Sequence, residues 1–223
     1  MFVLLQKFSP QSNNMNRLIL KKAYYSIKFM LYSFVVKNKR KIKRKIFFLT
    51  QKEYYTSKVF CIGFNKTGTT TLGKSFELLG YRNSSYNKEV WLNYYQNNEI
   101  IKILKYAAKF ESFDDLPWLK EDMIPILDKV FPNSKFVYLT RDRESWKKSF
   151  LKWGYKKWGE YPDADKKWEE YKRHEEFVLN YFKNRSKEDF IILDVKDEKG
   201  FLKLAEFLGK KTKREKFPVY NKS

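Results

Sequence analysis

The chain contains only one cysteine and one histidine in 223 residues, and this scarcity excludes several kinds of site. Cys61 has no partner for a disulfide within the chain, and it stands in an apolar run that predicts a buried strand. We therefore interpret it as a small core residue in a reducing compartment, and we expect a cytoplasmic protein. Cys61 and His174 together cannot supply a cluster with the ligand spacing of zinc sites, so we expect no metal.

A long hydrophobic run is also missing. The most apolar segment, residues 17–36, is interrupted by Lys21, Lys22 and Lys28, and its longest uncharged piece has eight residues. A membrane-spanning helix needs about 20 consecutive apolar residues, and the pattern of a cleavable signal is absent as well. The segment could instead be an amphipathic helix lying on an anionic membrane, an arm packed on a domain, or a poorly ordered extension.

Acidic residues are nearly absent from the first 58 positions, which hold fourteen Lys and Arg but only Glu53 as an acid. This segment carries +13 of the net charge of +21, and the remainder carries +8. We therefore predict a basic arm at residues 1–57 and one domain at residues 58–223. The basic cluster at residues 38–45 favours peripheral contact with an anionic membrane, whereas the charge of the domain suits an anionic ligand. We do not expect nucleic acid to be the partner.

Glycine is scarce too, but two of the eight glycines bound a hydroxyl-rich loop in the run VFCIGFNKTGTTTL, residues 59–72. An apolar run, a loop between Gly63 and Gly68 and a resumed helical spacing predict a strand, an anion-binding loop and a helix. The spacing matches the start of the nucleotide-binding pattern G-x-x-x-x-G-K-[ST], but Thr69 stands where that pattern has lysine. The lysine of this loop is Lys66.

Strand and helix patterns alternate along the rest of the chain. Strands are expected at the start of this loop, near residues 110–113, at residues 135–139 and, buried, at residues 189–194. Helices are expected at about residues 70–79, 89–110, 119–131, 144–152, 168–184 and 199–208. Residues 81–87 and 151–167 are expected to be loops, the second of them a lid. This alternation favours a three-layer α/β fold with a mainly parallel central sheet and helices on both faces.

Two polar groups follow expected strands. Asp114 and Asp115 come after the strand near residue 113, at the sheet edge where ligands gather in parallel α/β folds; the alternative for Asp115 is a helix cap. Arg141 follows the strand at residues 135–139, and Ser149 lies eight residues further on. An arginine fork and a hydroxyl can hold a phosphate together, although a surface salt bridge is a commoner role for arginine.

Four segments taken together resemble one family, the sulfotransferases that use 3′-phosphoadenosine 5′-phosphosulfate as donor. They are GFNKTGTTTL at residues 63–72, DDLPW at 114–118, FPNSKFVYLTRDRESWKKS at 131–149 and FLGKKTKREKFPVYN at 207–221. The resemblance covers about residues 58–221. It implies a P-loop NTPase-like sulfotransferase fold and transfer of a sulfuryl group to a hydroxyl or amine by in-line displacement.

The resemblance also implies roles for individual residues. Lys66 would contact the bridging oxygen of the phosphosulfate, the loop would cradle the 5′-phosphate, and Arg141 with Ser149 would hold the 3′-phosphate. A lysine inside the loop suits stabilisation of a leaving group without a metal. The implied donor-binding set is Asn65, Lys66, Thr67, Gly68, Thr69, Thr70, Thr71, Arg141 and Ser149.

The sequence leaves the catalytic base and the acceptor open. Asp115 is the first candidate for the base, and Asp114, Glu89 and His174 are the alternatives. The acceptor could be a small molecule, a glycan or a lipid, and the aromatic segments at residues 91–95 and 153–168 either line its pocket or belong to the core. A P-loop kinase is the closest enzymatic alternative, but the strand at residues 135–139 does not end in a magnesium-binding Asp. A catalytically inactive protein that binds membranes or nucleic acid through its basic arm is the alternative of another class.

Overall fold

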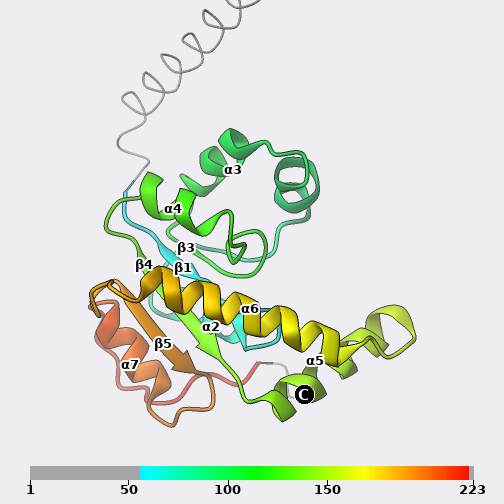
Figure 1. The fold of residues 1–223 in the computed structure, drawn as a ribbon. Coiled ribbons are helices and arrows are strands. Elements are labelled where there is room, and N and C mark those ends of the chain that lie inside the picture. The colour runs from blue at the N-terminus through cyan, green and yellow to red at the C-terminus, as the bar shows by residue number, and fades with distance from the viewer. Residues whose placement is uncertain (1–55, 221–223) are drawn as a thin grey trace, which may run out of the picture. The chain divides into compact units, whose positions relative to one another are not determined.

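The computed structural model describes residues 56–220, which lie within the second of two compact units of the chain, Glu53–Ser223 (Figure 1). The basic arm expected at residues 1–57 lies almost wholly outside the described residues, so its proposed contact with a membrane stays a prediction. None of the described helices is long and apolar enough to cross a membrane.

The described chain alternates short strands with helices. The strands are β1 (Val59–Cys61), β2 (Asn83–Ser84), β3 (Ser112–Phe113), β4 (Lys135–Thr140) and β5 (Phe190–Asp194). The helices are α2 (Thr69–Leu78), α3 (Ile100–Ala107), α4 (Ile124–Val130), α5 (Arg143–Trp158), α6 (Ala164–Phe182) and α7 (Gly200–Phe207), with a π-helix, η1 (Val90–Tyr95).

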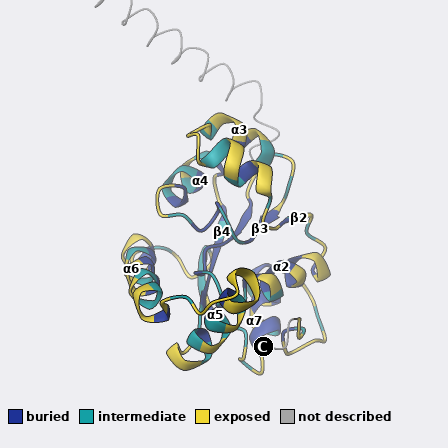
Figure 2. Ribbon diagram, turned by 90° about the vertical axis from the view of Figure 1, so that its right-hand side faces the viewer, coloured by how far each residue is buried: buried dark blue, intermediate teal, exposed yellow. Residues whose placement is uncertain are grey.

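The five strands form one sheet in the order β2-β3-β1-β4-β5, and every pair is parallel. In the centre of the sheet, Phe60 of β1 is in register with Phe113 of β3 on one side and Phe136 of β4 on the other. Figure 2 shows the sheet between α6 on one face and α2 with α7 on the other. The predicted three-layer α/β fold with a mainly parallel sheet is therefore confirmed.

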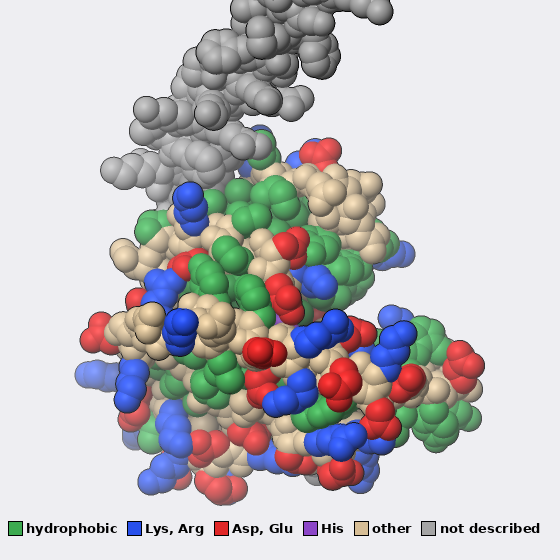
Figure 3. Space-filling view, in the orientation of Figure 1, with side chains coloured by type: hydrophobic (Ala, Val, Ile, Leu, Met, Phe, Trp, Pro, Cys, Tyr) green, Lys and Arg blue, Asp and Glu red, His purple; other side chains and the backbone are tan. Residues whose placement is uncertain are grey.

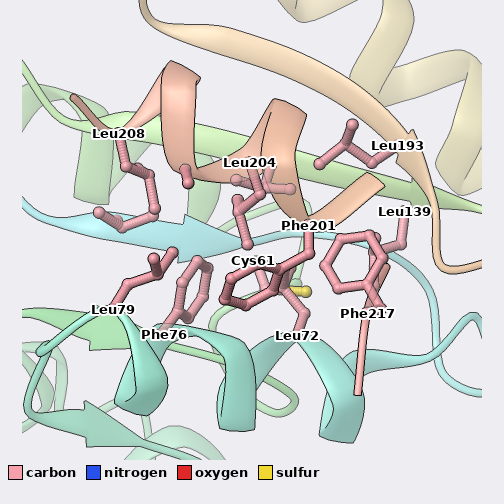
Figure 4. Packing of buried hydrophobic residues seen from close by; sticks show 13 residues of the cluster. Cys61, Leu72, Phe76, Leu79, Leu139, Leu193, Phe201, Leu204, Leu208 and Phe217 are labelled. Carbon is pink, nitrogen blue, oxygen red and sulfur yellow. The ribbon is translucent and has the colours of Figure 1, made fainter. Parts of the chain in front are cut away.

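Side chains alternate between the two faces of the sheet, as the pleat of a strand requires. Cys61 of β1 and Leu139 of β4 point to one face, where they pack with Leu72 of α2 and with Phe201 and Leu204 of α7 (Figure 4). Cys61 is fully buried there, as expected of a core residue. This layer fixes the start of α2, and with it the helix N-terminus that follows the glycine-bounded loop.

The opposite face is covered by aromatic rings. Phe60 stacks on Phe113 and Phe136, with ring centroids 4.9 Å and 5.5 Å away, and Phe136 packs 4.9 Å from Phe182 of α6. All four are almost completely buried, and full burial of such a side chain stabilises a protein by about 1.5–3 kcal/mol. The aromatic layer therefore holds α6 against the central strands.

The prediction of a loop or lid at residues 151–167 was wrong. α5 continues to Trp158 and α6 begins at Ala164, so only a short connection separates two long helices. The side chain of Asp142 caps α5 by accepting a hydrogen bond from the backbone N–H of Ser145, and Gly159 ends the helix in the left-handed conformation. Gly154, within the expected loop, is a helical residue on the buried side of α5.

Other boundaries also differ from the prediction. The expected loop at residues 81–87 contains the two-residue strand β2, and the expected helix at residues 89–110 divides into η1 and α3. α4 begins only at Ile124, where Pro125 can occupy the first turn because its missing N–H is not needed there. β5 is an edge strand rather than a buried one, since Ile192 is 46% exposed.

Candidate functional site

The loop between β1 and α2 can take its shape only with glycine at both ends. Gly68 has φ 111°, a conformation that other residues rarely adopt, and a Cβ atom there would lie 2.7 Å from Cγ1 of Val195. At Gly63 a Cβ atom would lie 2.7 Å from Cβ of Leu139. Between them, Lys66 also has a positive φ, 72°, which turns the loop at its lysine. The predicted loop is therefore a tight backbone turn packed against β4 and the segment after β5.

Three distant side chains hold carbonyl oxygens of this loop. Nε2 of His174 lies 2.8 Å from the Ile62 oxygen, Nε1 of Trp146 donates to the Asn65 oxygen at 2.8 Å, and Nη1 of Arg141 donates to the Lys66 oxygen at 2.9 Å. We call these three side chains the carbonyl anchors. They satisfy the acceptors of the loop, while the first N–H groups of α2 have no partner within a helix. Free N–H groups and the positive end of the helix dipole together make an anion-binding site.

His174 belongs to this support rather than to an exposed position from which it could act as a base. Because a carbonyl oxygen only accepts hydrogen bonds, Nε2 of His174 must carry the proton. The ring is almost completely buried, and this burial lowers the pKa of His174, so the neutral form is favoured.

The threonines of the loop differ in exposure. Thr67 is buried, and its hydroxyl donates to the Phe64 oxygen at 2.7 Å, so it stabilises the loop itself. Thr69, Thr70 and Thr71 form the first turn of α2; Thr69 is buried, Thr71 is half-buried and Thr70 is exposed. Their position at the helix N-terminus is the one expected for residues that cradle a phosphate.

Lys66 is half-buried, and its ammonium group lies over the ring of Trp153 from α5, 4.4 Å from the ring centroid. The pKa of Lys66 is lowered to about 8, chiefly by burial; Asp115 opposes this shift, and Lys157 and Arg141 contribute to it. The ammonium of Lys66 is therefore only partly solvated. A bound anion would stabilise its charge in place of the water that burial excludes.

Asp115 is the acidic residue that contacts the loop. Its Oδ1 accepts hydrogen bonds from Nδ2 of Asn65 at 3.0 Å and from the backbone N–H of Leu116 at 2.8 Å. Burial raises the pKa of Asp115, against the opposing effects of these hydrogen bonds and of Lys66. The alternative interpretation as a helix cap is wrong, because α4 starts nine residues later, at Ile124.

The other two acidic candidates lie in different surroundings. Asp114 accepts hydrogen bonds from Nδ2 of Asn83 at 2.7 Å and from Oγ of Ser85 at 2.8 Å, and burial raises its pKa to about 6. Its carboxylate ties the end of β3 to the segment of β2. Glu89 is exposed and accepts a hydrogen bond from the hydroxyl of Tyr94 at 2.6 Å. Neither carboxylate is bonded to the glycine-bounded loop.

Arg141 follows β4 directly, and the structure brings it to the loop as a carbonyl anchor. Its backbone N–H donates to the hydroxyl of Tyr171 at 3.1 Å, and its Nε is buried without a partner among the described residues. No carboxylate pairs with Arg141 in the described part of the chain. Residues 56–220 therefore do not show the surface salt bridge that was the alternative role for this arginine. A buried donor of this kind leaves part of the guanidinium fork available to an anion.

Ser149 is half-buried on α5, as the expected helix after Arg141 requires. Within residues 56–220, its hydroxyl makes no hydrogen bond to Arg141 or to the loop. The structure therefore gathers Asn65, Lys66, Asp115 and Arg141 directly, whereas the pairing of Arg141 with Ser149 stays a prediction.

Two tryptophans of α5 contact the loop: sequence reasoning missed Trp146, and it named Trp153 only as part of the aromatic segment at residues 153–168. Trp146 and Phe150 are buried four residues apart, a spacing that marks the inner face of a helix, so burial of Trp146 could have been predicted. No local pattern signals that its indole N–H reaches Asn65. The described residues also contain no group of three His, Cys, Asp or Glu side chains that could hold a metal ion.

Comparisons with known proteins give one family match and similar solved structures. Residues 58–164, from the start of β1 to the start of α6, match the family model described as "Sulfotransferase domain". No curated protein sequence matches the chain significantly. Among solved structures, the sulfotransferase domain from the curacin biosynthetic pathway is similar, with 17% identity, a TM-score of 0.48, and coverage of 72% of this chain and 76% of that chain. The matched stretch, residues 58–164, contains the loop, the Asp114–Asp115 pair, Arg141 and Ser149, and it is similar to the sulfotransferase family that the sequence resembles.

Proposed function

We propose that the protein transfers a sulfuryl group from 3′-phosphoadenosine 5′-phosphosulfate to a hydroxyl or amine of a small molecule, glycan or lipid. The observation that carries the proposal is the position of Lys66. Its half-buried ammonium stands at a glycine-bounded helix N-terminus, with the guanidinium of Arg141 and the carboxylate of Asp115 close enough to act on its charge. Such a transfer needs cations to stabilise the leaving group and a base to accept a proton. Lys66 and Arg141 would supply the cations, and Asp115 would supply the base.

The residues present fit the phosphate groups of this donor. The loop offers N–H groups at the start of α2 and has no room for a side chain at Gly63 or Gly68. Arg141 offers a buried Nε–H without a partner in the described residues, which suits the second phosphate site that distinguishes this donor from ATP. Ser149, on the helix that follows, is the proposed second contact to that 3′-phosphate.

The bound donor would supply an activated sulfuryl group, whose sulfur–oxygen bond to the 5′-phosphate breaks as the acceptor oxygen or nitrogen bonds to sulfur. Lys66 would stabilise the electron pair left on the phosphate oxygen, an effect worth about 2.7–4 kcal/mol for one preorganised donor. Asp115 would take the proton of the acceptor. Its burial favours this role, because a raised pKa makes a carboxylate a stronger base.

Ligand-dependent thermal unfolding of the full chain tests the donor. At a concentration of 100 times its dissociation constant, adenosine 3′,5′-bisphosphate should stabilise the protein by about 2.7 kcal/mol without magnesium. For a domain of this size, that is a rise in Tm of roughly 5–11 °C. Stabilisation by ATP that requires magnesium, with none by adenosine 3′,5′-bisphosphate, would instead support a P-loop kinase and overturn the proposal.

Transfer of labelled sulfate tests the reaction itself. The protein, with donor carrying labelled sulfur, should label acceptors in a cell extract, and Asp115→Asn should lower the rate by about 10²–10⁴ because it removes the proposed base. A variant that keeps the wild-type turnover with the labelled acceptor would show that Asp115 is not the base. Asn is suited to this test because its side-chain oxygen can still accept the hydrogen bond from Leu116.

A further inference from the structure

Two ammonium groups share the ring of Trp153. Nζ of Lys66 lies 4.4 Å from the ring centroid, and Nζ of Lys157, one turn further along α5, lies 4.8 Å from it. The π-face of an indole ring attracts a cation, but two cations at one ring repel each other. This repulsion contributes to the lowered pKa of Lys66. An anion bound near the ring would relieve it.

The proposed donor accounts for Lys66 and Arg141 but leaves Lys157 without a role. Two other lysines near this region have carboxylate partners: Lys147 pairs with Asp165 and Lys167 with Glu170. In residues 56–220, no carboxylate pairs with Lys157. Its ammonium contacts only the rings of Trp153 and Trp158, the second at 5.3 Å.

A simpler reason for a lysine at this position is the helix dipole, because cations in the last turn of a helix are favourable. Lys156 and Lys157 both lie in the last turn of α5, so the dipole accounts for both. The dipole does not account for the difference between the two lysines. Of the two, only Lys157 lies over the rings of Trp153 and Trp158 in the described structure. Lys156 is therefore a matched control for the charge and the helix position of Lys157.

An aromatic surface continues outward from this point. Trp158 meets Trp153 edge to face at 4.9 Å and is 50% exposed, and beside it the exposed rings of Tyr155 and Tyr161 stack at 4.8 Å. In Figure 3, hydrophobic side chains gather at the right-hand end of the molecule, where Figure 1 shows the connection between α5 and α6. Aromatic rings exposed to this extent beside the proposed reacting lysine suit the face of a sugar or of another aromatic ring.

We propose that Lys157, with Trp153 and Trp158, forms an acceptor subsite for compounds that carry an anionic group, such as a carboxylate, on a sugar or aromatic framework. This inference rests on the proposed function, because the acceptor must reach Lys66 to receive a sulfuryl group. The anionic group pairs with the ammonium of Lys157, and the framework lies against the indole rings. The pairing holds a hydroxyl of the acceptor near the sulfuryl group of the donor and relieves the repulsion between the two ammonium groups.

A matched pair of ligands tests the subsite: 4-methylumbelliferyl β-D-glucuronide and 4-methylumbelliferyl β-D-glucoside. They share the aromatic ring and the sugar hydroxyls and differ only in a carboxylate against a hydroxymethyl group. Dissociation constants are measured by ligand-observed NMR on the full chain saturated with adenosine 3′,5′-bisphosphate. The wild type should bind the glucuronide about two- to fivefold more tightly, as expected for one exposed ion pair.

The variants decide between the subsite and the helix dipole. Lys157→Gln should bind the two ligands equally, whereas Lys156→Gln should keep the wild-type preference. Equal binding of both ligands by the wild type, or equal losses in the two variants, would overturn the proposal. The preference should also decline with added salt, because an exposed charge pair is screened.

The same proteins separate this inference from the proposed function. Thermal shifts with adenosine 3′,5′-bisphosphate should be alike in the wild type and in Lys157→Gln, because Lys157 is assigned to the acceptor. Loss of the shift in Lys157→Gln alone would place Lys157 in the donor site and overturn the acceptor subsite. Absence of the thermal shift in the wild type would instead contradict the proposed donor. The NMR titration would then be done on the protein without nucleotide.

Discussion

Replacing Trp146 by phenylalanine tests whether the carbonyl anchors keep the loop competent for anions. Trp146 is fully buried, and its N–H donates to the Asn65 oxygen at 2.8 Å. The substitution removes this hydrogen bond, worth about 0.5–1.5 kcal/mol, and leaves unfilled volume in the core that costs about 1–2 kcal/mol. The free energy of unfolding should fall by about 1.5–3.5 kcal/mol, which lowers the Tm by roughly 3–14 °C for a domain of this size.

Trp168→Phe is the control for lost ring volume. Trp168 packs against Trp146 with ring centroids 5.3 Å apart, but its own indole N–H makes no hydrogen bond to another of the described residues. Calorimetric titration with adenosine 3′,5′-bisphosphate should show binding about tenfold weaker in Trp146→Phe than in Trp168→Phe, because only the first variant frees a loop carbonyl. If Trp146→Phe binds as the wild type does, or if both variants weaken binding equally, the idea of carbonyl anchors is refuted.

Further predictions concern the charged groups of the site. Lys66→Met should lower the rate of sulfuryl transfer by about 10²–10³, whereas Lys74→Met, which removes an exposed lysine of α2, should leave it unchanged. The wild-type kcat/KM should decrease as the pH rises through about 8, because the ammonium of Lys66 loses its proton there; a profile that stays flat to higher pH would contradict this. Arg141→Lys should weaken binding of adenosine 3′,5′-bisphosphate about tenfold more than binding of adenosine 5′-monophosphate, because loss of the bond to the Lys66 oxygen affects both nucleotides but loss of the fork assigned to the 3′-phosphate affects only the first; equal losses would argue against that assignment. Burial raises the pKa of Asp114 from 3.8 to about 6, so the folded state binds this proton more tightly and urea titrations should show the free energy of unfolding falling by roughly 3 kcal/mol between about pH 4 and 6. Asp114→Asn should lack this fall.

The elements that could be predicted from the sequence are those set by local patterns. An apolar run predicts β4, and two glycines predict the loop before α2; both patterns lie within a few residues. α5 extends beyond the helix expected at residues 144–152 and includes Gly154, although glycine is unfavourable inside a helix. A Cβ atom at residue 154 would lie 2.4 Å from the ring of Pro162, so this glycine is required by a tertiary contact rather than by a turn. The strand β2 has only two residues and carries no periodic signal at all.

The candidate site also has features that local sequence predicts and features that it does not. The loop and its lysine are local features, and Arg141 could be placed because it follows a clear strand. The carbonyl anchors Arg141, Trp146 and His174 reach the loop across 75, 81 and 112 residues of sequence. Such contacts depend on how α5 and α6 pack on the sheet, and one sequence contains no spacing that reports them.

The two neighbouring acids after β3 show most clearly what the backbone adds. The backbone N–H of Asp114 bonds to the Ser84 oxygen at 3.2 Å, which continues the sheet and turns its carboxylate toward α2, where a Cβ atom at Gly73 would lie 2.0 Å from its Oδ2. Asp115 has φ 69°, which reverses the chain and directs its carboxylate to Asn65 in the loop. Burial raises the pKa of both residues, so their acidity does not separate them. The direction of each side chain does, because only the carboxylate of Asp115, the first candidate from the sequence, contacts the loop, whereas that of the alternative, Asp114, does not.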